Sequence, residues 1–541
     1  MSVHSVRPEE RFEEPAAPAE GRAARRREQQ QGGRGSDGRL AAALVLVLPT
    51  LVALVPIVRG IGDRQLWRDE HATWWAASLS IHDLSVLIRT IDVVFTPYYV
   101  CMHLWVMVAG DSPTALRIPG AAAMALSAGL LGLLGRRLFT TRVGLVAGLV
   151  LAVLPSTTRY GQEIRPYAFA VAAVLLSTLL LARALDRPTF KVWVGYTLSV
   201  PLVGWSHLAS LAVLAPHLVM ILIARRAGDR IVGWAYAAAA TLGMCFVLPM
   251  AIQGSGQSGQ IAWNNPVFQD LVDFPKNLFG SWQVAVPIMV LAGAGLCFAG
   301  RRALPLAVWI VLPPLLTYVT AAKLHLFLPR YLLFTMPAWV LLGAVAVCRI
   351  AGPVAGAKAG AGAAVRKGFG MVLAFAAVAG LAWQALPGIR DARQLPLGEP
   401  DFRAAAQIVA KDQRKGDGIA FNGVMAERRA IDYELRDDPG RPKDVLMYRT
   451  PQQLGSFGAA ECPRPASCLA RTERLWLVAT TYNGDPYAGM PKPTRTAIDR
   501  SFRVVRTKKL ENLQVLLLER TRSAKGSGSD GDDAGDRKLH T

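Results

Sequence analysis

Long apolar runs alternate with short polar or basic segments along most of this chain. A helical run of about 20 apolar residues can cross roughly 30 Å of hydrocarbon. Such runs recur at residues 40–60, 115–135, 143–160, 166–185, 191–207, 208–224, 231–252, 284–299, 304–322, 331–348 and 369–388. The pattern predicts an α-helical polytopic membrane protein with about eleven transmembrane helices.

The ends of the chain and one late segment lack this pattern. Residues 1–38 are polar and lack a signal-peptide core, which predicts a disordered cytoplasmic tail. Residues 39–388 form the predicted transmembrane domain. Residues 389–522 are more charged and predict a small α/β domain, and residues 523–541 predict a second disordered tail.

Within residues 389–522, local periodicity predicts a helix followed by strands. The helix is expected at 404–411, and the strands at 418–421, 475–480, 503–507 and 514–518.

Basic residues mark one side of the membrane, because Lys and Arg collect in cytoplasmic loops. Every second loop between the predicted spans is basic, so these loops lie on the same side of the membrane. This pattern predicts a cytoplasmic N-terminus and an extracytoplasmic α/β domain. The basic loops contain Arg25 to Arg27, Arg136, Arg137, Arg142, Arg183 to Lys191, Arg225 to Arg230, Arg301, Arg302 and Arg349 to Lys367.

Residues 91–110 are apolar but short, and counting them as a span would reverse the side of the Arg136 loop. We therefore expect residues 81–90 and 91–110 to form helices along the membrane interface, a depth that Tyr and Trp favour.

Composition narrows the class of protein further. The 541 residues are 52% hydrophobic and 18% charged, with a mean hydropathy of +0.29 and a net charge of +21. Basic residues are not interleaved with aromatic ones as in a nucleic-acid groove, so we expect the lipid bilayer and no nucleic acid as a partner.

Asp69 and Glu70 form an acidic pair just outside the first apolar run. Carboxylates close to a bilayer are costly unless a cation or a reaction uses them, so both are candidate catalytic residues. Asp69 suits a general base, and Glu70 could orient a substrate hydroxyl. A local alternative has Asp69 capping the next helix with Glu70 exposed.

Two arginines at outer mouths of spans are candidates to bind phosphate. Arg165 can grip phosphate oxygens with its planar guanidinium, and Arg330 occupies a matching position. The alternatives are a contact of Arg165 with Glu163 or a lipid headgroup, and a simple anchoring role for Arg330 beside Tyr331.

Several short motifs on the predicted outer side occur in a familiar order. They are Trp67 to Glu70, Thr73 to Trp75, Tyr98-Tyr99, His103 to Trp105, Tyr160 to Tyr167, Trp205 to His207, and Pro329 to Leu332 with Pro337. Over residues 40–350 the chain resembles the bacterial glycosyltransferases of the C-type fold that use polyprenyl-phosphate-sugar donors, including the dolichyl-phosphate-mannose-protein-mannosyltransferase-like and aminoarabinose-transferase-like families. It departs from them at Phe95-Thr96-Pro97, where a His-Pro-Pro-like element is usual.

The resemblance implies a fold, a reaction and site residues. Asp69 would be the catalytic base, and Glu70 could help to bind a divalent cation, although no cofactor is otherwise required. His207 would contact substrate, unless it is an ordinary helix-end residue. The substrate-binding candidates in the same motifs are Gln162, Glu163, Tyr167, His207 and Tyr331.

The predicted function is transfer of a sugar, mannose or a related hexose or pentose, from a polyprenyl-phosphate carrier to an extracytoplasmic glycan, lipid or protein. An alternative is a lipid-linked-sugar flippase or transporter, although no internal repeat is evident. Another is a non-catalytic protein of cell-envelope assembly, which the altered Phe95-Thr96-Pro97 element suggests.

Cys462 and Cys468 are separated by five residues within the predicted extracytoplasmic domain. An oxidising compartment would favour a local disulfide between them, with two free thiols in a loop as the alternative. Without a second Cys or His pair nearby, zinc is not expected there.

Overall fold

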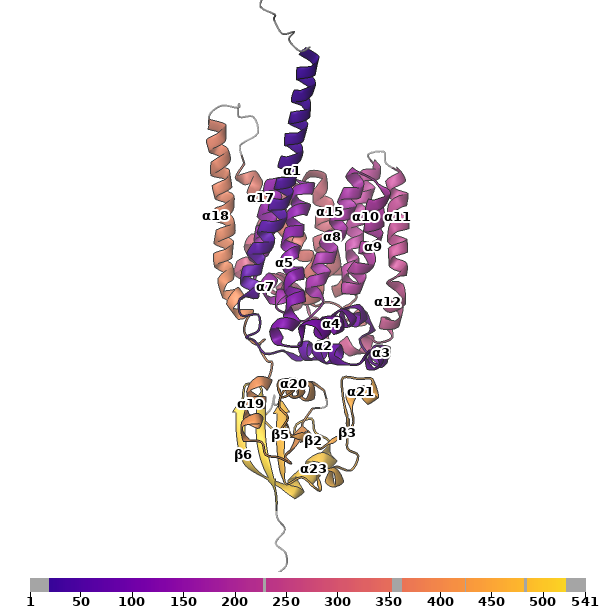
Figure 1. Ribbon diagram of the computed structural model, residues 1–541, viewed down its shortest axis with the longest axis vertical. Helices are drawn as coiled ribbons and strands as arrows, with labels where there is room; N and C mark the ends of the chain where they lie inside the picture. Colours follow the sequence, from indigo (N-terminus) through magenta and orange to yellow (C-terminus); the bar gives the residue numbers. More distant parts are fainter. Residues whose placement is uncertain (1–18, 227–229, 353–361, 424, 481–483, 522–541) are drawn as a thin grey trace, which may run out of the picture.

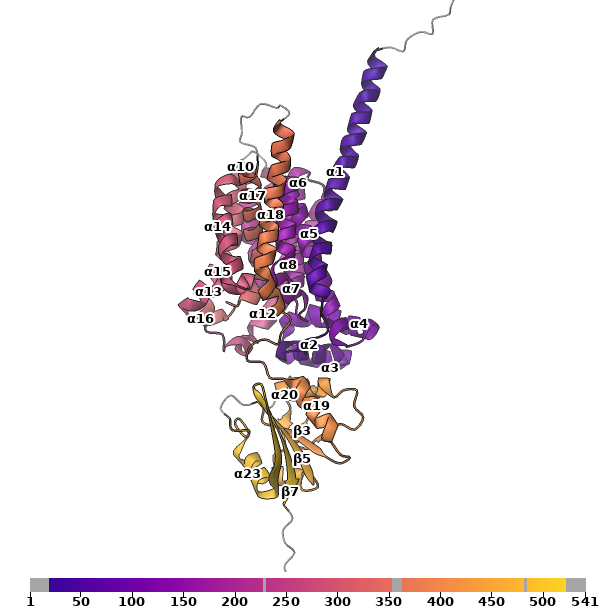
Figure 2. The same ribbon diagram turned by 90° about the vertical axis from the view of Figure 1, so that its left-hand side faces the viewer.

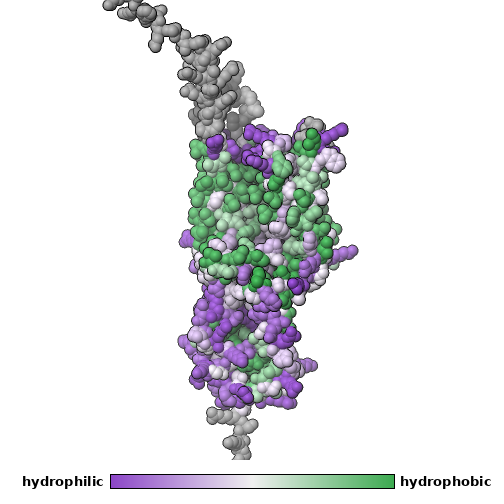
Figure 3. All heavy atoms as spheres, turned by 45° about the vertical axis from the view of Figure 1, so that its right-hand side comes forward, coloured by the Kyte–Doolittle hydropathy of each residue, from purple (hydrophilic) through white to green (hydrophobic). Residues whose placement is uncertain are grey.

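A bundle of helices and a separate α/β domain make up the protein (Figure 1). The computed structural model describes residues 19–226, 230–352, 362–423, 425–480 and 484–521. On the face that Figure 3 shows, apolar residues cover most of the side of the bundle, and hydrophilic residues predominate on the α/β domain and at the opposite end of the bundle.

Within the described part of the chain, seven helical segments are long and apolar enough to cross a membrane. They lie in α1 (Ala19–Val58), α5 (Pro113–Leu138), α8 (Tyr167–Asp186), α10 (Leu214–Arg226) with η2 (Leu208–Val213), α15 (Ala303–Val319) with η4 (Gly300–Arg302), α17 (Met336–Ile350) with η5 (Pro329–Thr335), and α18 (Gly362–Asp391).

Two bent helix pairs raise the count of spans to nine if each pair crosses once. The pair α6 (Thr141–Ala152) and α7 (Pro155–Gly161) bends by 63°, and the pair α11 (Arg230–Cys245) and α12 (Leu248–Ser255) by 51°. Pro155 begins α7, where its missing N–H breaks the helical ladder. The chain is a multi-pass membrane protein.

The two remaining predicted spans form helices of 17 residues, α9 (Phe190–Ser206) and α14 (Trp282–Phe298). Both are short for a 30 Å crossing, since a helix rises about 1.5 Å per residue. The count of eleven therefore stays a prediction.

Small residues let the first helices pack closely. A Cβ added at Gly132 of α5 would collide with the Val45 carbonyl of α1, and one at Gly144 of α6 would collide with the Gly132 carbonyl. Membrane helices associate through such close backbone approach, because lipid supplies no hydrophobic drive between them.

Short helices lie across the end of the bundle that faces the α/β domain (Figures 1 and 2). They are α2 (Arg68–Ser78), α3 (Ile81–Thr90), η1 (Val93–Phe95) and α4 (Thr96–Ala109). Their placement agrees with the expected interfacial helices at 81–110. The remaining short elements of this region are η3 (Ser258–Ile261), α13 (Phe268–Phe279) and α16 (Ala321–Leu324).

The α/β domain contains a five-stranded sheet with the strand order β2-β1-β5-β7-β6. Strand β1 pairs in parallel with β2 and β5, whereas β7 pairs antiparallel with β5 and β6. The strands are β1 (Gly418–Phe421), β2 (Lys443–Asp444), β5 (Arg474–Thr480), β6 (Phe502–Leu510) and β7 (Leu513–Arg520), and the main helices are α19 (Phe402–Asp412), α20 (Ala426–Glu434) and α23 (Lys492–Ser501). The predicted helix and the four predicted strands are all present.

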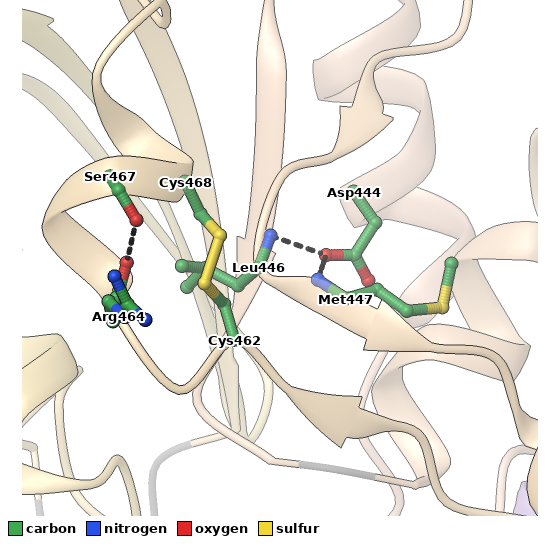
Figure 4. Close-up of a disulfide and its surroundings, with 7 residues drawn as sticks. All are labelled: Asp444, Leu446, Met447, Cys462, Arg464, Ser467 and Cys468. Atoms are coloured by element: carbon green, nitrogen blue, oxygen red, sulfur yellow. Dashed lines mark hydrogen bonds between the residues drawn. A yellow bond between two sulfur atoms is a disulfide. The ribbon is translucent and has the colours of Figure 1, made fainter.

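A smaller hairpin carries the predicted cysteine pair. Strands β3 (Met447–Arg449) and β4 (Ala460–Glu461) pair antiparallel, flanked by α21 (Pro451–Leu454) and α22 (Pro465–Leu469). Cys462 and Cys468 are joined by a disulfide with an S–S distance of 2.02 Å (Figure 4). Cys462 also donates its backbone N–H to the Leu446 carbonyl.

The boundaries predicted at the ends of the chain stay predictions. Helix α1 begins at Ala19, within the range predicted to be a disordered tail. Residues 1–18 and 522–541, with the predicted tail at 523–541, lie outside the described residues. Helix α18 ends at Asp391, three residues beyond the expected domain boundary at 388.

Candidate active site

The acidic pair lies in the first turn of α2, where carboxylates complement the helix dipole. The two side chains face different surroundings. Glu70 has no exposed surface, whereas the Asp69 side chain is 34% exposed. The alternative with Asp69 as the helix cap and Glu70 exposed is therefore wrong. Glu70 takes the capping role, since its carboxylate accepts the Trp67 backbone N–H at 3.2 Å.

Glu70 is held by a network of donors. Arg117 of α5 donates to its two oxygens at 2.8 and 3.2 Å, and Arg64 lies 3.7 Å away. The backbone N–H of Ile164 donates to it at 3.0 Å. Burial alone would raise the pKa of this carboxyl, but Arg117 and Arg64 lower it overall. Glu70 thus ties α2, α5 and the Ile164 loop together as a fixed carboxylate.

Among the described residues, Asp69 has one ion-pair partner within 4 Å, which is Arg330. One Asp69 carboxylate oxygen lies 3.9 Å from Nη2 of Arg330, at the start of η5. The Arg330 guanidinium also lies 5.8 Å from the ring centre of Trp67 and 5.6 Å from that of Tyr331. This loose contact leaves the carboxylate room for a second partner.

Arg165 has few partners for a buried cation. Its side chain is 6% exposed, and Nη1 donates to the Thr73 hydroxyl at 3.3 Å. The guanidinium stacks over the Phe95 ring at 4.5 Å, and its Nε has no hydrogen-bond partner among the described residues. The alternative ion pair with Glu163 is absent, since Glu163 contacts Arg159 instead at 3.3 Å. A buried donor without a partner is suited to an anionic ligand.

Three aromatic rings lie beside these arginines. The His207 ring is 4.5 Å from that of Tyr331 and 5.9 Å from that of Tyr167. Burial, with Arg165 and Arg330 nearby, lowers the pKa of His207 to about 3. The imidazole is therefore neutral at pH 7, and its Nδ1 and the Tyr167 hydroxyl are buried without hydrogen-bond partners in the described structure.

Two predicted substrate contacts, Gln162 and Glu163, have partners within the protein. The Gln162 amide donates to the Ile57 and Arg59 carbonyls at 2.6 and 3.2 Å, which fastens the loop to the end of α1. Glu163 is buried, and burial raises its pKa. The Gln162 amide is thereby occupied with the backbone. Glu163 Oε1 contacts Arg159, and Glu163 Oε2 is buried without a hydrogen-bond partner in the described structure.

Asp92 belongs to the site but was not singled out from the sequence. It precedes η1 in a left-handed conformation with φ of 57°, which Asp tolerates better than most residues. Its carboxylate accepts the Tyr99 hydroxyl at 2.7 Å, and burial raises its pKa. A lone Asp inside an apolar stretch was the available signal.

The α/β domain contributes a further cation near the acidic groups. Arg429 of α20 is 7% exposed and donates to the Phe457 carbonyl at 2.8 Å. Burial lowers its pKa to about 10, and the charges of Asp69 and Asp92 are close enough to act in the opposite direction. No local pattern around Arg429 indicates this role, since it depends on how the domain docks.

Docking of the domain on α2 uses both polar and aromatic contacts. Arg68 pairs with Glu399 at 2.8 Å, and Gln65 donates to the Pro400 carbonyl at 2.8 Å. The His71 ring lies between those of Phe402 and Tyr433, at 6.1 and 5.6 Å. The sheet domain thus covers the face of α2 next to the acidic pair.

A mostly apolar cavity of about 250 Å³ opens beside the site. Its polar lining comes mainly from Asp92, His207, Tyr331, Gln257 and Gln260, and its apolar lining from Val94, Phe95, Leu208, Ala251, Ile261, Leu324 and Leu326. Such a cavity suits the apolar part of an amphiphilic ligand whose charged group contacts the arginines.

No group of three or more His, Cys, Asp and Glu side chains in the described part of the chain could hold a metal ion. Glu70, the candidate for a divalent cation, is already surrounded by Arg117 and Arg64. The divalent cation stays a prediction from the resemblance.

Residues 74–252 match the family model described as Dolichyl-phosphate-mannose-protein mannosyltransferase. The resemblance drawn from the sequence is confirmed. Comparison with curated proteins gives no match.

Solved structures share the architecture. ArnT from Cupriavidus metallidurans in the apo state superposes with a TM-score of 0.57 at 14% identity, over 87% of this chain and 97% of that one. The same protein bound to undecaprenyl phosphate gives 0.54 at 15% identity, over 88% and 98%. The Archaeoglobus fulgidus oligosaccharyltransferase in its apo form gives 0.46 at 10% identity, over 85% and 72%. The two ArnT structures, with TM-scores above 0.5, confirm the predicted C-type glycosyltransferase fold.

Proposed function

We propose that this protein is a membrane glycosyltransferase that moves a sugar from a polyprenyl-phosphate carrier to an extracytoplasmic glycan, lipid or protein. The observation that carries the proposal is one half-exposed carboxylate, Asp69, 3.9 Å from Arg330 at the same mouth as the buried Arg165. The family match over residues 74–252 supports the reaction class. The ArnT structure with undecaprenyl phosphate supports a polyprenyl-phosphate lipid as donor carrier.

Each charged group has a task in one balanced step. The acceptor hydroxyl oxygen attacks the anomeric carbon, and Asp69 takes the hydroxyl proton. The bond from that carbon to the phosphate oxygen breaks, and its electron pair leaves with the phosphate. Arg165 and Arg330 stabilise this negative charge, as fixed cations do where charge develops in a transition state. We expect inversion at the anomeric carbon, as the resemblance implies.

The other residues act around this step. Tyr167, Tyr331 and the neutral imidazole of His207 line the site beside both arginines, which suits contacts to the sugar or the phosphate. Glu70 is reassigned from catalysis to positioning, because it has no exposed surface and is held by two arginines. Gln162 and Glu163 likewise position the loop that carries Arg165.

The lipid and the acceptor would approach from different sides. The cavity lined by Leu324, Leu326 and Ile261 would take the first prenyl units of the carrier. The α/β domain with Arg429 would border the acceptor side, with the N-terminus in the cytoplasm and this domain outside. We propose mannose or a related hexose or pentose as the sugar.

The test compares membranes that contain the parent protein, Asp69→Asn or Asp83→Asn. Sugar transfer from radiolabelled polyprenyl-phosphate-mannose to a native envelope extract is measured, and polyprenyl-phosphate-arabinose is supplied in parallel. Removing a general base costs about 10² to 10⁴ in rate, so Asp69→Asn should be nearly inactive. Asp83 is a partly exposed carboxylate of the neighbouring α3, and its variant should match the parent.

The outcomes separate the candidate functions. Equal transfer by the parent and Asp69→Asn would show that Asp69 is not the base. Movement of labelled lipid across vesicles without sugar transfer would favour the flippase. Absence of both reactions with both donors would favour the non-catalytic assembly protein.

A further inference from the structure

The end of the bundle opposite Asp69 contains a pocket of about 530 Å³ that the proposed reaction does not use. Helix α8 spans the distance between the two, since Tyr167 at its start borders the site and Asp186 at its end lines the pocket. At 1.5 Å per residue this separation is about 30 Å, the thickness of the hydrocarbon core. The pocket therefore opens at the other membrane face.

The rim of this pocket is strongly basic. Arg301 and Arg302 come from η4, Arg137 from the last turn of α5 and Arg349 from the last turn of α17. Asp186 supplies one carboxylate, which pairs with Arg137 at 2.8 Å. The other three arginines are exposed and have no carboxylate partner in the described part of the chain.

The depth of the pocket is apolar in effect. Trp309 and Thr178 both line the pocket. Thr178 lies eight residues before Asp186 in α8, so it is about 12 Å below the rim. The polar groups at this depth already have partners, because His217 contacts the Thr178 and Tyr196 hydroxyls at 3.0 Å each. Trp309 donates to the Phe334 carbonyl at 3.0 Å. The remaining apolar lining includes Met220, Ile223, Pro305, Leu306 and Phe298.

Arginines at helix C-termini and in cytoplasmic loops have general explanations, because they complement the helix dipole and set topology. Those explanations apply equally to Arg225 and Arg230, which lie at the same end of the bundle. Neither of these lines the pocket. Convergence of three unpaired arginines from η4 and α17 on one apolar pocket needs a further reason.

We infer that this pocket binds an anionic phospholipid, with the phosphate on Arg301, Arg302 and Arg349 and the acyl chains against the apolar depth. Guanidinium groups match phosphate oxygens bidentately, and basic pockets between membrane helices on the cytoplasmic side bind anionic headgroups. Arg302 is already oriented, since its guanidinium lies 5.4 Å from the ring centre of Phe139.

The experiment measures lipids retained by the detergent-purified full-length protein in native mass spectrometry. Phosphatidylglycerol, phosphatidylcholine and glycerol 3-phosphate are titrated separately. The parent should retain phosphatidylglycerol in preference to the other two. Arg301→Gln with Arg302→Gln should weaken this binding about tenfold or more, and Arg225→Gln with Arg230→Gln should leave it unchanged.

Two further variants test whether a loss of binding results from misfolding and not from the lost guanidinium groups. Arg301→Lys with Arg302→Lys should retain part of the binding, and Ala224→Phe, which keeps every charge but adds bulk at the lining, should reduce it. The inference is overturned if the Arg225 and Arg230 double variant loses phosphatidylglycerol as much as the Arg301 and Arg302 double variant does. It is also overturned if Ala224→Phe binds phosphatidylglycerol like the parent, or if glycerol 3-phosphate binds as well as the lipid. Because the readout is binding, the result is independent of sugar transfer.

Discussion

Glu70 has its charge neutralised by Arg117 and Arg64, whereas the one ion pair of Asp69 among the described residues is with Arg330 at 3.9 Å. Two adjacent residues of the same charge thus have different energetic consequences. A buried carboxylate with paired donors contributes to the native state mainly because its removal strands the arginines. A half-exposed carboxylate contributes little to folding and is available for chemistry.

Replacement of Glu70 by Gln should therefore act on stability. Breaking a buried ion pair costs about 3 to 5 kcal/mol, and we expect a loss of this size in the free energy of unfolding. Thermal or denaturant unfolding of the purified protein measures it, with Asp69→Asn as the control within about 1 kcal/mol of the parent. A Glu70→Gln protein that is fully stable but inactive would return Glu70 to the catalytic residues.

Replacement of Arg165 by Lys should act on transfer. Lysine keeps the charge but loses the planar fork and the stacking on Phe95, so we expect kcat/KM for the donor to fall about a hundredfold. Steady-state kinetics of sugar transfer measure this. Arg89→Lys, at an exposed position in the last turn of α3, should remain near the parent value. Equal losses in both variants would indicate an effect that is not specific to Arg165.

At the scale of elements, α2 lies between the bundle and the α/β domain and joins the two. His71 of α2, on the face toward the α/β domain, is fully buried. Both of its ring nitrogens lack hydrogen-bond partners in the described structure. Burial lowers the pKa of this imidazole from 6.5 to about 3. Domain docking is thereby linked to pH.

The sign of this linkage follows from proton binding. Below pH 6.5 the unfolded chain protonates His71 while the native protein does not, so the free energy of unfolding falls as pH falls toward 3. We expect a loss of about 2 kcal/mol between pH 6.5 and about pH 5. Denaturant unfolding at several pH values should show a shallower dependence in His71→Phe. His82→Phe, at an exposed position of α3, should keep the parent's dependence, and an unchanged slope in His71→Phe would contradict the assignment.

Helices and strands could be predicted from the sequence where a single local pattern of apolar residues determines the type of element. The length of apolar runs located the helices, and short runs of apolar and β-branched residues located strands β1, β5, β6 and β7. The bend at Pro155 and the short α14 were not predicted, because run length alone does not show where a helix breaks or ends. Within the site, chemistry and order along the chain indicated Asp69 and Arg165. The burial of Glu70 depends on Arg117, 47 residues away, which no local pattern reveals.

At the scale of the whole molecule, the N-terminal end of α1 and the α/β domain lie at opposite ends of the bundle (Figure 1). This arrangement requires an odd number of crossings between them. Together with the basic loops, it predicts a cytoplasmic N-terminus and an extracytoplasmic C-terminal domain.

Fusion reporters test this orientation. Alkaline phosphatase fused after the α/β domain should be active, since it folds only outside the cytoplasm, and a fluorescent protein fused before α1 should fluoresce. Phosphatase fused just after Arg137, at the basic end of α5, serves as the control and should be inactive. Activity there, with inactivity at the C-terminus, would invert the topology.

The contacts that join the start of α2 to the α/β domain also have an order in time. Arg64 donates to the Ala392 carbonyl and Gln65 to the Pro400 carbonyl, across 328 and 335 residues of chain. At about 5 to 20 residues per second, the ribosome needs tens of seconds to make that length. Arg64 and Gln65 thus leave the ribosome tens of seconds before the carbonyl groups that accept their hydrogen bonds.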